Sequence, residues 1–91
     1  MSTNLQPIPL GLTGVKPYID FIVTTGAEME DGDTTYQNDA FGSNPSVFID
    51  GLLLTYAVCA DRRYVSYDPA TKTITLNNSG VNEGENIQIF L

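Results

Sequence analysis

The chain has 91 residues, of which 42% are hydrophobic, and it carries 4 Lys and Arg against 11 Asp and Glu, with one Cys and no His or Trp. A chain of this length can bury only one small core, and its net charge of −7 argues against nucleic acid as a partner, because proteins that bind a phosphate backbone gather Lys and Arg. The absence of His excludes Ser-His-Asp and Cys-His catalytic sites and His-containing zinc sites.

Residues 1–17 combine three prolines with aliphatic side chains that follow no helical period. Proline fixes φ and removes a hydrogen-bond donor, which favours extended backbone over helix or central strand. We therefore expect an extended N-terminal arm that lies on its own core or on a neighbouring subunit. Its aliphatic residues are Leu5, Ile8, Leu10, Leu12 and Val15. The start of the chain has no basic residue before a hydrophobic run, so we expect neither a signal peptide nor a membrane anchor, and we predict assembly in the cytoplasm.

Residues 18–25 predict a strand, because nearly all of them are β-branched or aromatic. Its expected core face carries Ile19, Phe21 and Val23. Residues 26–45 then show neither a period of 2 nor one of 3.6 and predict a long, solvated acidic loop. Its acids are Glu28, Glu30, Asp31, Asp33 and Asp39.

The acidic loop invites a calcium hypothesis, which its spacing does not support. A calcium loop that starts at Asp31 needs Gly at its sixth position and Glu at its twelfth. The chain has Tyr36 and Gly42 there. We therefore expect no metal and no other cofactor.

Two hairpins are predicted in the second half of the chain. Asp50-Gly51 separates two apolar runs, 46–49 and 52–56, and Asp-Gly is a preferred type I′ turn. Residues 63–67 and 72–76 flank an Asp68-Pro69 turn, which lets Val65 and Tyr67 face Ile74 and Leu76. After a polar loop, Ile87, Ile89 and Leu91 share one face of a last strand.

These elements predict an all-β fold, a small antiparallel β-sandwich or partly open barrel of about six strands that forms a single domain over residues 18–91. Cys59 follows the apolar run 52–58 and is expected to be buried and inert. A carboxylate pair such as Asp50 and Asp61 can be drawn, but Asp50 is explained by its turn, so we expect no enzymatic activity. Arg62 and Arg63 are expected to pair with carboxylates.

The second half resembles small β-sandwich modules of tailed-bacteriophage structural proteins, which share a hydrophobic strand ending in an N/D-G turn, an aromatic residue near the next strand, a Thr/Ile-rich strand and an acidic Gly turn before a final strand. The corresponding segments are Val47 to Gly51, Tyr64, Thr73 to Leu76, and Gly84-Glu85 before Ile87 to Phe90. The chain departs from these modules at Arg63, where they often carry Asp, and its first 45 residues have no counterpart.

This resemblance implies a structural virion protein, either a capsid auxiliary or decoration protein or a fibre module, located in the virion. Its expected partners are capsid or other virion subunits and further copies of itself, without nucleic acid or membrane. The arm and the sheet surface would make the contacts. The candidate partner-binding residues are Leu5, Ile8, Leu10, Leu12, Val15, Tyr36, Arg62 and Arg63. The alternative is a fibre or tail module that binds glycans or a host surface through loop 26–45 and tyrosines such as Tyr36 and Tyr64.

Overall fold

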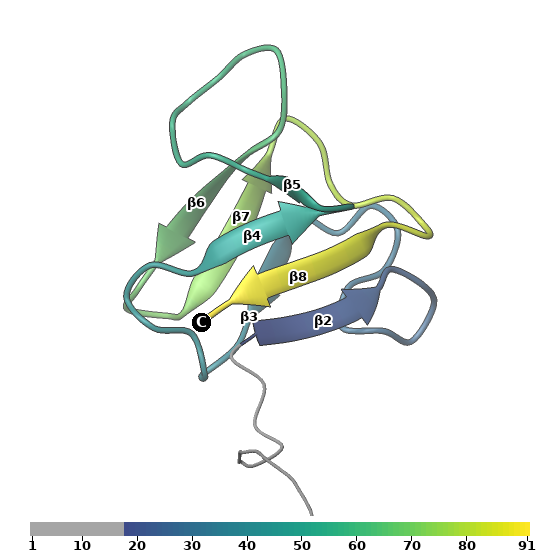
Figure 1. The fold of residues 1–91 in the computed structure, drawn as a ribbon, viewed down its shortest axis with the longest axis horizontal. Coiled ribbons are helices and arrows are strands. Elements are labelled where there is room, and N and C mark those ends of the chain that lie inside the picture. The colour runs from purple at the N-terminus through teal and green to yellow at the C-terminus, as the bar shows by residue number, and fades with distance from the viewer. Residues whose placement is uncertain (1–17) are drawn as a thin grey trace, which may run out of the picture.

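The computed structural model of the protein describes residues 18–91, which form seven strands in two antiparallel sheets (Figure 1). The strands are β2 (Tyr18–Ile22), β3 (Thr35–Gln37), β4 (Ser46–Ile49), β5 (Leu52–Leu53), β6 (Tyr64–Asp68), β7 (Thr73–Asn77) and β8 (Asn86–Phe90). One sheet has the order β2-β8-β4-β5 and the other β3-β7-β6. This architecture confirms the all-β prediction and matches a small sandwich. The predicted arm, residues 1–17, lies outside the described residues.

Both predicted hairpins are present. Asp50 and Gly51 have φ angles of 52° and 82°, as a type I′ turn requires of its two central residues. In the second hairpin Val65 lies opposite Leu76 and Tyr67 opposite Ile74. Local turn chemistry therefore fixes the register of these two pairs.

β8 lies at the centre of the four-stranded sheet. It pairs with β2 on one side and with β4 on the other, and it buries Ile87 and Ile89 completely. The prediction that Leu91 belongs to this strand is wrong, because β8 ends at Phe90; Leu91 is 40% exposed. Phe90 is the last residue with cross-strand partners, so Leu91 lies beyond the ladder.

The prediction of one long loop over residues 26–45 is also wrong. The segment contains β3, which pairs with β7, and it buries Met29 and Phe41 to 1% exposure. A strand of three residues is too short to show a period of 2, and the two buried side chains stand isolated in a polar stretch. The acidic side chains of the segment are exposed as expected.

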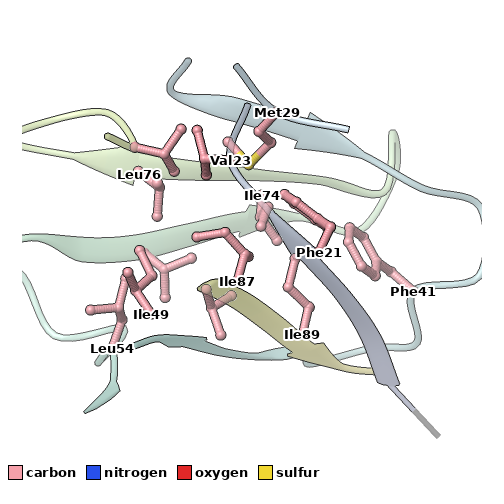
Figure 2. Close-up of a cluster of buried hydrophobic side chains, with 13 residues drawn as sticks. Phe21, Val23, Met29, Phe41, Ile49, Leu54, Ile74, Leu76, Ile87 and Ile89 are labelled. Atoms are coloured by element: carbon pink, nitrogen blue, oxygen red, sulfur yellow. The ribbon is translucent and has the colours of Figure 1, made fainter. Parts of the chain in front are cut away.

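The core lies between the two sheets (Figure 2). Alternate residues of the strands point inward and meet Met29 and Phe41 from the 26–45 segment and Val81 from the segment before β8. The buried hydrophobic residues are Phe21, Val23, Met29, Phe41, Val47, Ile49, Leu54, Val65, Ile74, Leu76, Val81, Ile87 and Ile89. Burying each large side chain contributes about 1.5–3 kcal/mol, so connecting segments as well as strands stabilise the fold.

Candidate functional site

The most exposed apolar side chains of the described residues lie on β5 and the segment after it. The run 52–56 was predicted to be a strand, but β5 has only two residues, and of residues 52–58 Leu54 alone is buried. Leu52 is 70% exposed, Tyr56 39% and Val58 83%; we call these three side chains the β5 patch. The prediction fails because the chain leaves the sheet after Leu54 and runs toward β6 in the other sheet.

The segment between β5 and β6, which projects from one end of the molecule in Figure 1, has several anchors. The backbone carbonyl of Thr55 accepts a hydrogen bond from the Val65 amide at 2.9 Å. The Tyr56 hydroxyl donates to the Pro45 carbonyl, and burial raises the pKa of this phenol above its ordinary value. Asn78, in the left-handed region at φ 80°, donates from Nδ2 to the carbonyls of Cys59 and Arg62.

These anchors hold the backbone of the segment while the side chains of the β5 patch face solvent. Cys59 belongs to the same segment and is only half-buried, so the prediction of a buried thiol is wrong. A run of apolar residues indicates burial only if the chain stays in the sheet, and here it does not.

A cavity of about 300 Å³ opens beside β5. Its apolar lining comes from the end of β4, from β5 and from Leu54, and two arginines also line it. The lining residues are Ile49, Leu52, Leu53, Leu54, Thr55, Arg62 and Arg63. Arg62 is exposed, and within residues 18–91 no carboxylate lies at ion-pair distance from its guanidinium. The expected carboxylate partner of Arg62 is thus not found there.

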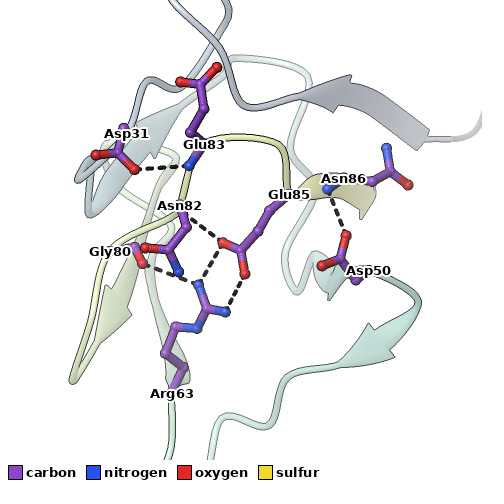
Figure 3. A network of polar contacts seen from close by, with 8 residues as sticks. All are labelled: Asp31, Asp50, Arg63, Gly80, Asn82, Glu83, Glu85 and Asn86. Atoms are coloured by element: carbon purple, nitrogen blue, oxygen red, sulfur yellow. Dashed lines mark hydrogen bonds and ion pairs between the residues drawn. The ribbon is translucent and has the colours of Figure 1, made fainter.

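Arg63 is bound within the fold (Figure 3). Its guanidinium donates to both carboxylate oxygens of Glu85, at 3.0 and 2.7 Å, and to the Gly80 carbonyl at 3.1 Å. The hydrogen bond with Glu85 raises the pKa of Arg63, and the same hydrogen bond lowers the pKa of Glu85. This confirms the predicted carboxylate pair for Arg63 and shows that its guanidinium joins β6 to the segment before β8.

Several acidic side chains accept hydrogen bonds from backbone amides. Asp31 accepts from the Glu83 amide at 2.8 Å, and Asp50 accepts from the Asn86 amide at 2.9 Å (Figure 3). Between positions 18 and 91 no three metal-ligating side chains gather into a group that could hold an ion. Sequence reasoning treated the acids as solvated charge and missed that some of them connect separate segments.

Tyr36 lies against the core. Its ring meets the rings of Phe21 and Phe41 edge-on, with centroids 5.6 and 5.8 Å away, and its hydroxyl accepts a hydrogen bond from Asn38. Tyr67 likewise contacts the core and donates its hydroxyl proton to the Gly42 carbonyl. These contacts leave Tyr36 only partly accessible to a partner. Tyr36 lies on β3 at one edge of the three-stranded sheet, whereas Arg62 and Arg63 precede β6 at the other edge, so the structure does not bring them together in one site.

The remaining candidate residues belong to the arm and lie outside the described residues. They are Leu5, Ile8, Leu10, Leu12 and Val15. Within residues 18–91 no helix is long and apolar enough to cross a lipid bilayer. Comparison of the chain with known protein families, curated proteins and solved structures finds no match.

Proposed function

We propose that the chain is a non-enzymatic structural virion protein, a capsid auxiliary or decoration protein that binds capsid subunits through the β5 patch. The β5 patch carries this proposal, because Leu52, Tyr56 and Val58 are exposed on an anchored segment. The backbone of this segment accepts hydrogen bonds at Thr55, Cys59 and Arg62, and its Tyr56 hydroxyl donates to the Pro45 carbonyl. The virion role itself rests on the resemblance of residues 46–91 to phage modules.

An anchored apolar segment suits binding to a large surface. Protein interfaces bury aromatic and aliphatic anchors in their centre and leave charged residues at the rim. A segment that is already fixed pays less conformational entropy when it binds. The β5 patch has both properties, since its side chains are exposed while the backbone of its segment accepts hydrogen bonds from Val65 and Asn78 and the Tyr56 hydroxyl donates to the Pro45 carbonyl.

Arg62 indicates the chemistry of the partner. Arg62 lines the same cavity as Leu52. A partner that inserts an aliphatic side chain into this cavity and places a carboxylate against Arg62 would satisfy both features. A capsid subunit bearing such a loop is the partner we propose.

The test compares a patch variant with a matched control in particles assembled from the genome that encodes the chain. The variant L52S/V58S removes the two most exposed side chains of the patch, and I22S removes a 50% exposed side chain on β2. We expect wild type and I22S to co-sediment with particles and L52S/V58S to be depleted at least about tenfold, with unchanged melting temperatures. Absence of the wild-type protein from particles, or equal incorporation of both variants, contradicts the proposal.

The glycan-binding alternative is tested in parallel on a glycan array. Tyr64 is half-buried at the start of β6, and the Tyr64→Ala variant removes its ring. Clear glycan binding by wild type that disappears in this variant would replace the capsid role with host-surface recognition.

A further inference from the structure

The four-stranded sheet has a second apolar surface on the face that points away from the core. Each of its four strands brings one apolar side chain to this face, at a position that alternates with the core residues. The Tyr18 and Phe90 rings stack with centroids 5.0 Å apart, and Phe48 meets Phe90 edge-on at 5.4 Å. Leu53 lies opposite Phe48 in the register. We call Tyr18, Phe90, Phe48 and Leu53 the outer strip.

This outer face is nearly free of charge, although the chain carries a net charge of −7. Among the residues of β2, β8, β4 and β5 that point outward, Asp20 alone is charged. Its carboxylate accepts a hydrogen bond from Asn86 Nδ2 at 2.8 Å. The other charged side chains of residues 18–91 lie in turns, in connecting segments or on the second sheet. The outer face is therefore the surface on which a strongly acidic protein is repelled least.

A second copy of the chain is the partner that fits this pattern. The outer strip carries no charge, so a strongly basic or acidic partner gains nothing there from charge pairing. Its complement is another apolar and aromatic strip of the same length, which a second copy supplies. Two copies that met through a face bearing several acids would instead place like charges together.

The size of the outer face sets the strength of such a contact. Four strands about 4.8 Å apart, and up to about five residues long at about 3.3 Å per residue, give a face of about 19 by 17 Å. This is about 300 Å² in projection, whereas a stable interface buries about 800 Å² on each partner. The contact is therefore sized for a weak, reversible dimer.

The position of Asp20 selects how the two copies face each other. Asp20 on β2 aligns with Gln88 on β8, which aligns with Phe48. Phe48 in turn aligns with Leu53, so Asp20 and Leu53 lie in one row at opposite edges of the sheet. A two-fold axis parallel to the strands would press each Asp20 carboxylate onto Leu53 of the other copy, without a cation to pair with it. An axis along the outer strip places the two Asp20 side chains on opposite sides of the contact.

We propose that two copies of the chain pack face to face through the outer strip, related by a two-fold axis that runs along the strip, to form a weak dimer. Phe90 and Leu53 of each copy then contact the same residues of the other. This inference goes beyond the capsid role and does not depend on it, because no residue of the outer strip belongs to the β5 patch.

The test measures the mass of the full chain by sedimentation equilibrium up to about 1 mM protein. We expect the mass to rise from one chain to two, and the dissociation constant to fall as NaCl is raised from about 50 to about 500 mM, because salt screens the repulsion between two acidic chains. Phe90→Ser should weaken the dimer at least about tenfold. The matched control Val58→Ser, which removes a more exposed apolar side chain from the β5 patch, should leave the dissociation constant unchanged.

A pair of variants at Leu53 keeps the test valid if Phe90→Ser lowers the stability of the fold. Leu53 is 52% exposed on the two-residue edge strand β5, so the fold should tolerate both Leu53→Lys and Leu53→Asp. Each variant alone should dimerise more weakly than wild type. An equimolar mixture should associate at least about tenfold more tightly than either variant, since the axis brings position 53 of one copy onto position 53 of the other.

Three results would overturn the inference. A wild-type chain that stays a monomer at about 1 mM protein and about 500 mM NaCl does not form the dimer. Equal effects of Phe90→Ser and Val58→Ser would place self-association on another surface. A mixture of the two Leu53 variants that associates no more tightly than either alone would exclude the axis along the outer strip.

Discussion

Deleting residues 88–91 tests the position of β8 as the strand that holds the four-stranded sheet together. The deletion removes the partners of Tyr18, Ile19 and Asp20 on β2 and of Ser46, Val47 and Phe48 on β4. What remains of β8 is Asn86 and Ile87. Ile89, which is 0% exposed, is lost from the core.

The deletion should cost more free energy than the whole unfolding free energy of a domain of this size. Truncating a buried Ile to Ala costs about 2–5 kcal/mol, and each ladder hydrogen bond lost adds about 1 kcal/mol. A domain of this length is stable by only about 5–10 kcal/mol. We therefore expect the truncated protein to be unfolded at 25 °C, with collapsed dispersion in its amide NMR spectrum and no cooperative transition in urea.

A graded variant keeps the reasoning testable if the truncated protein cannot be purified. Ile89→Ala should lower the urea-unfolding free energy by about 3 kcal/mol with an unchanged m-value. Gln88→Ala, one residue earlier on the opposite face of the same strand, should cost less than about 1 kcal/mol. A truncated protein that melts at the wild-type temperature, or equal effects of the two substitutions, would refute the central role of β8.

Three further substitutions probe the contacts between segments. Gly80→Ala should destabilise the fold by about 3 kcal/mol in urea, because a Cβ there would lie 2.5 Å from a backbone oxygen of the acidic segment; a loss below about 1 kcal/mol contradicts this close approach. Since hydrogen bonding to Arg63 lowers the pKa of Glu85, wild type should be more stable than Glu85→Gln, and this difference in unfolding free energy should be at its full size at pH 7. It should disappear as pH falls below the unfolded value of about 4.3 and through the folded pKa, and a difference that is equal at pH 7 and pH 3 would argue against the pair. Asp50→Ala should cost about 2 kcal/mol, because it loses both the positive-φ residue and the acceptor for the Asn86 amide, whereas Asp50→Asn retains both and should cost well under half as much by thermal melting.

The candidate site illustrates where sequence reasoning stops. The sequence predicts the type of partner that an arginine takes, and Arg63 does pair with a carboxylate. Its partner Glu85, however, lies 22 residues away, and no local sequence pattern identifies it. The β5 patch could not be predicted for a different reason. Leu52 to Val58 has the composition of a buried strand, but β5 is a two-residue strand at the edge of its sheet and exposes Leu52, and after Leu54 the chain departs toward β6.

By itself the sequence determined the all-β class and the two hairpins, because those features depend on neighbouring residues: alternating apolar side chains and the positive φ of Asp50-Gly51. Only the tertiary structure decided that the last strand is central, that β3 completes the second sheet against β7, and that Met29 and Phe41 enter the core. The physical reason is the large sequence separation between the residues that pair. β2 and β8 pair across more than 60 residues, and the choice among such distant partners depends on the packing of the whole core, which no short segment encodes.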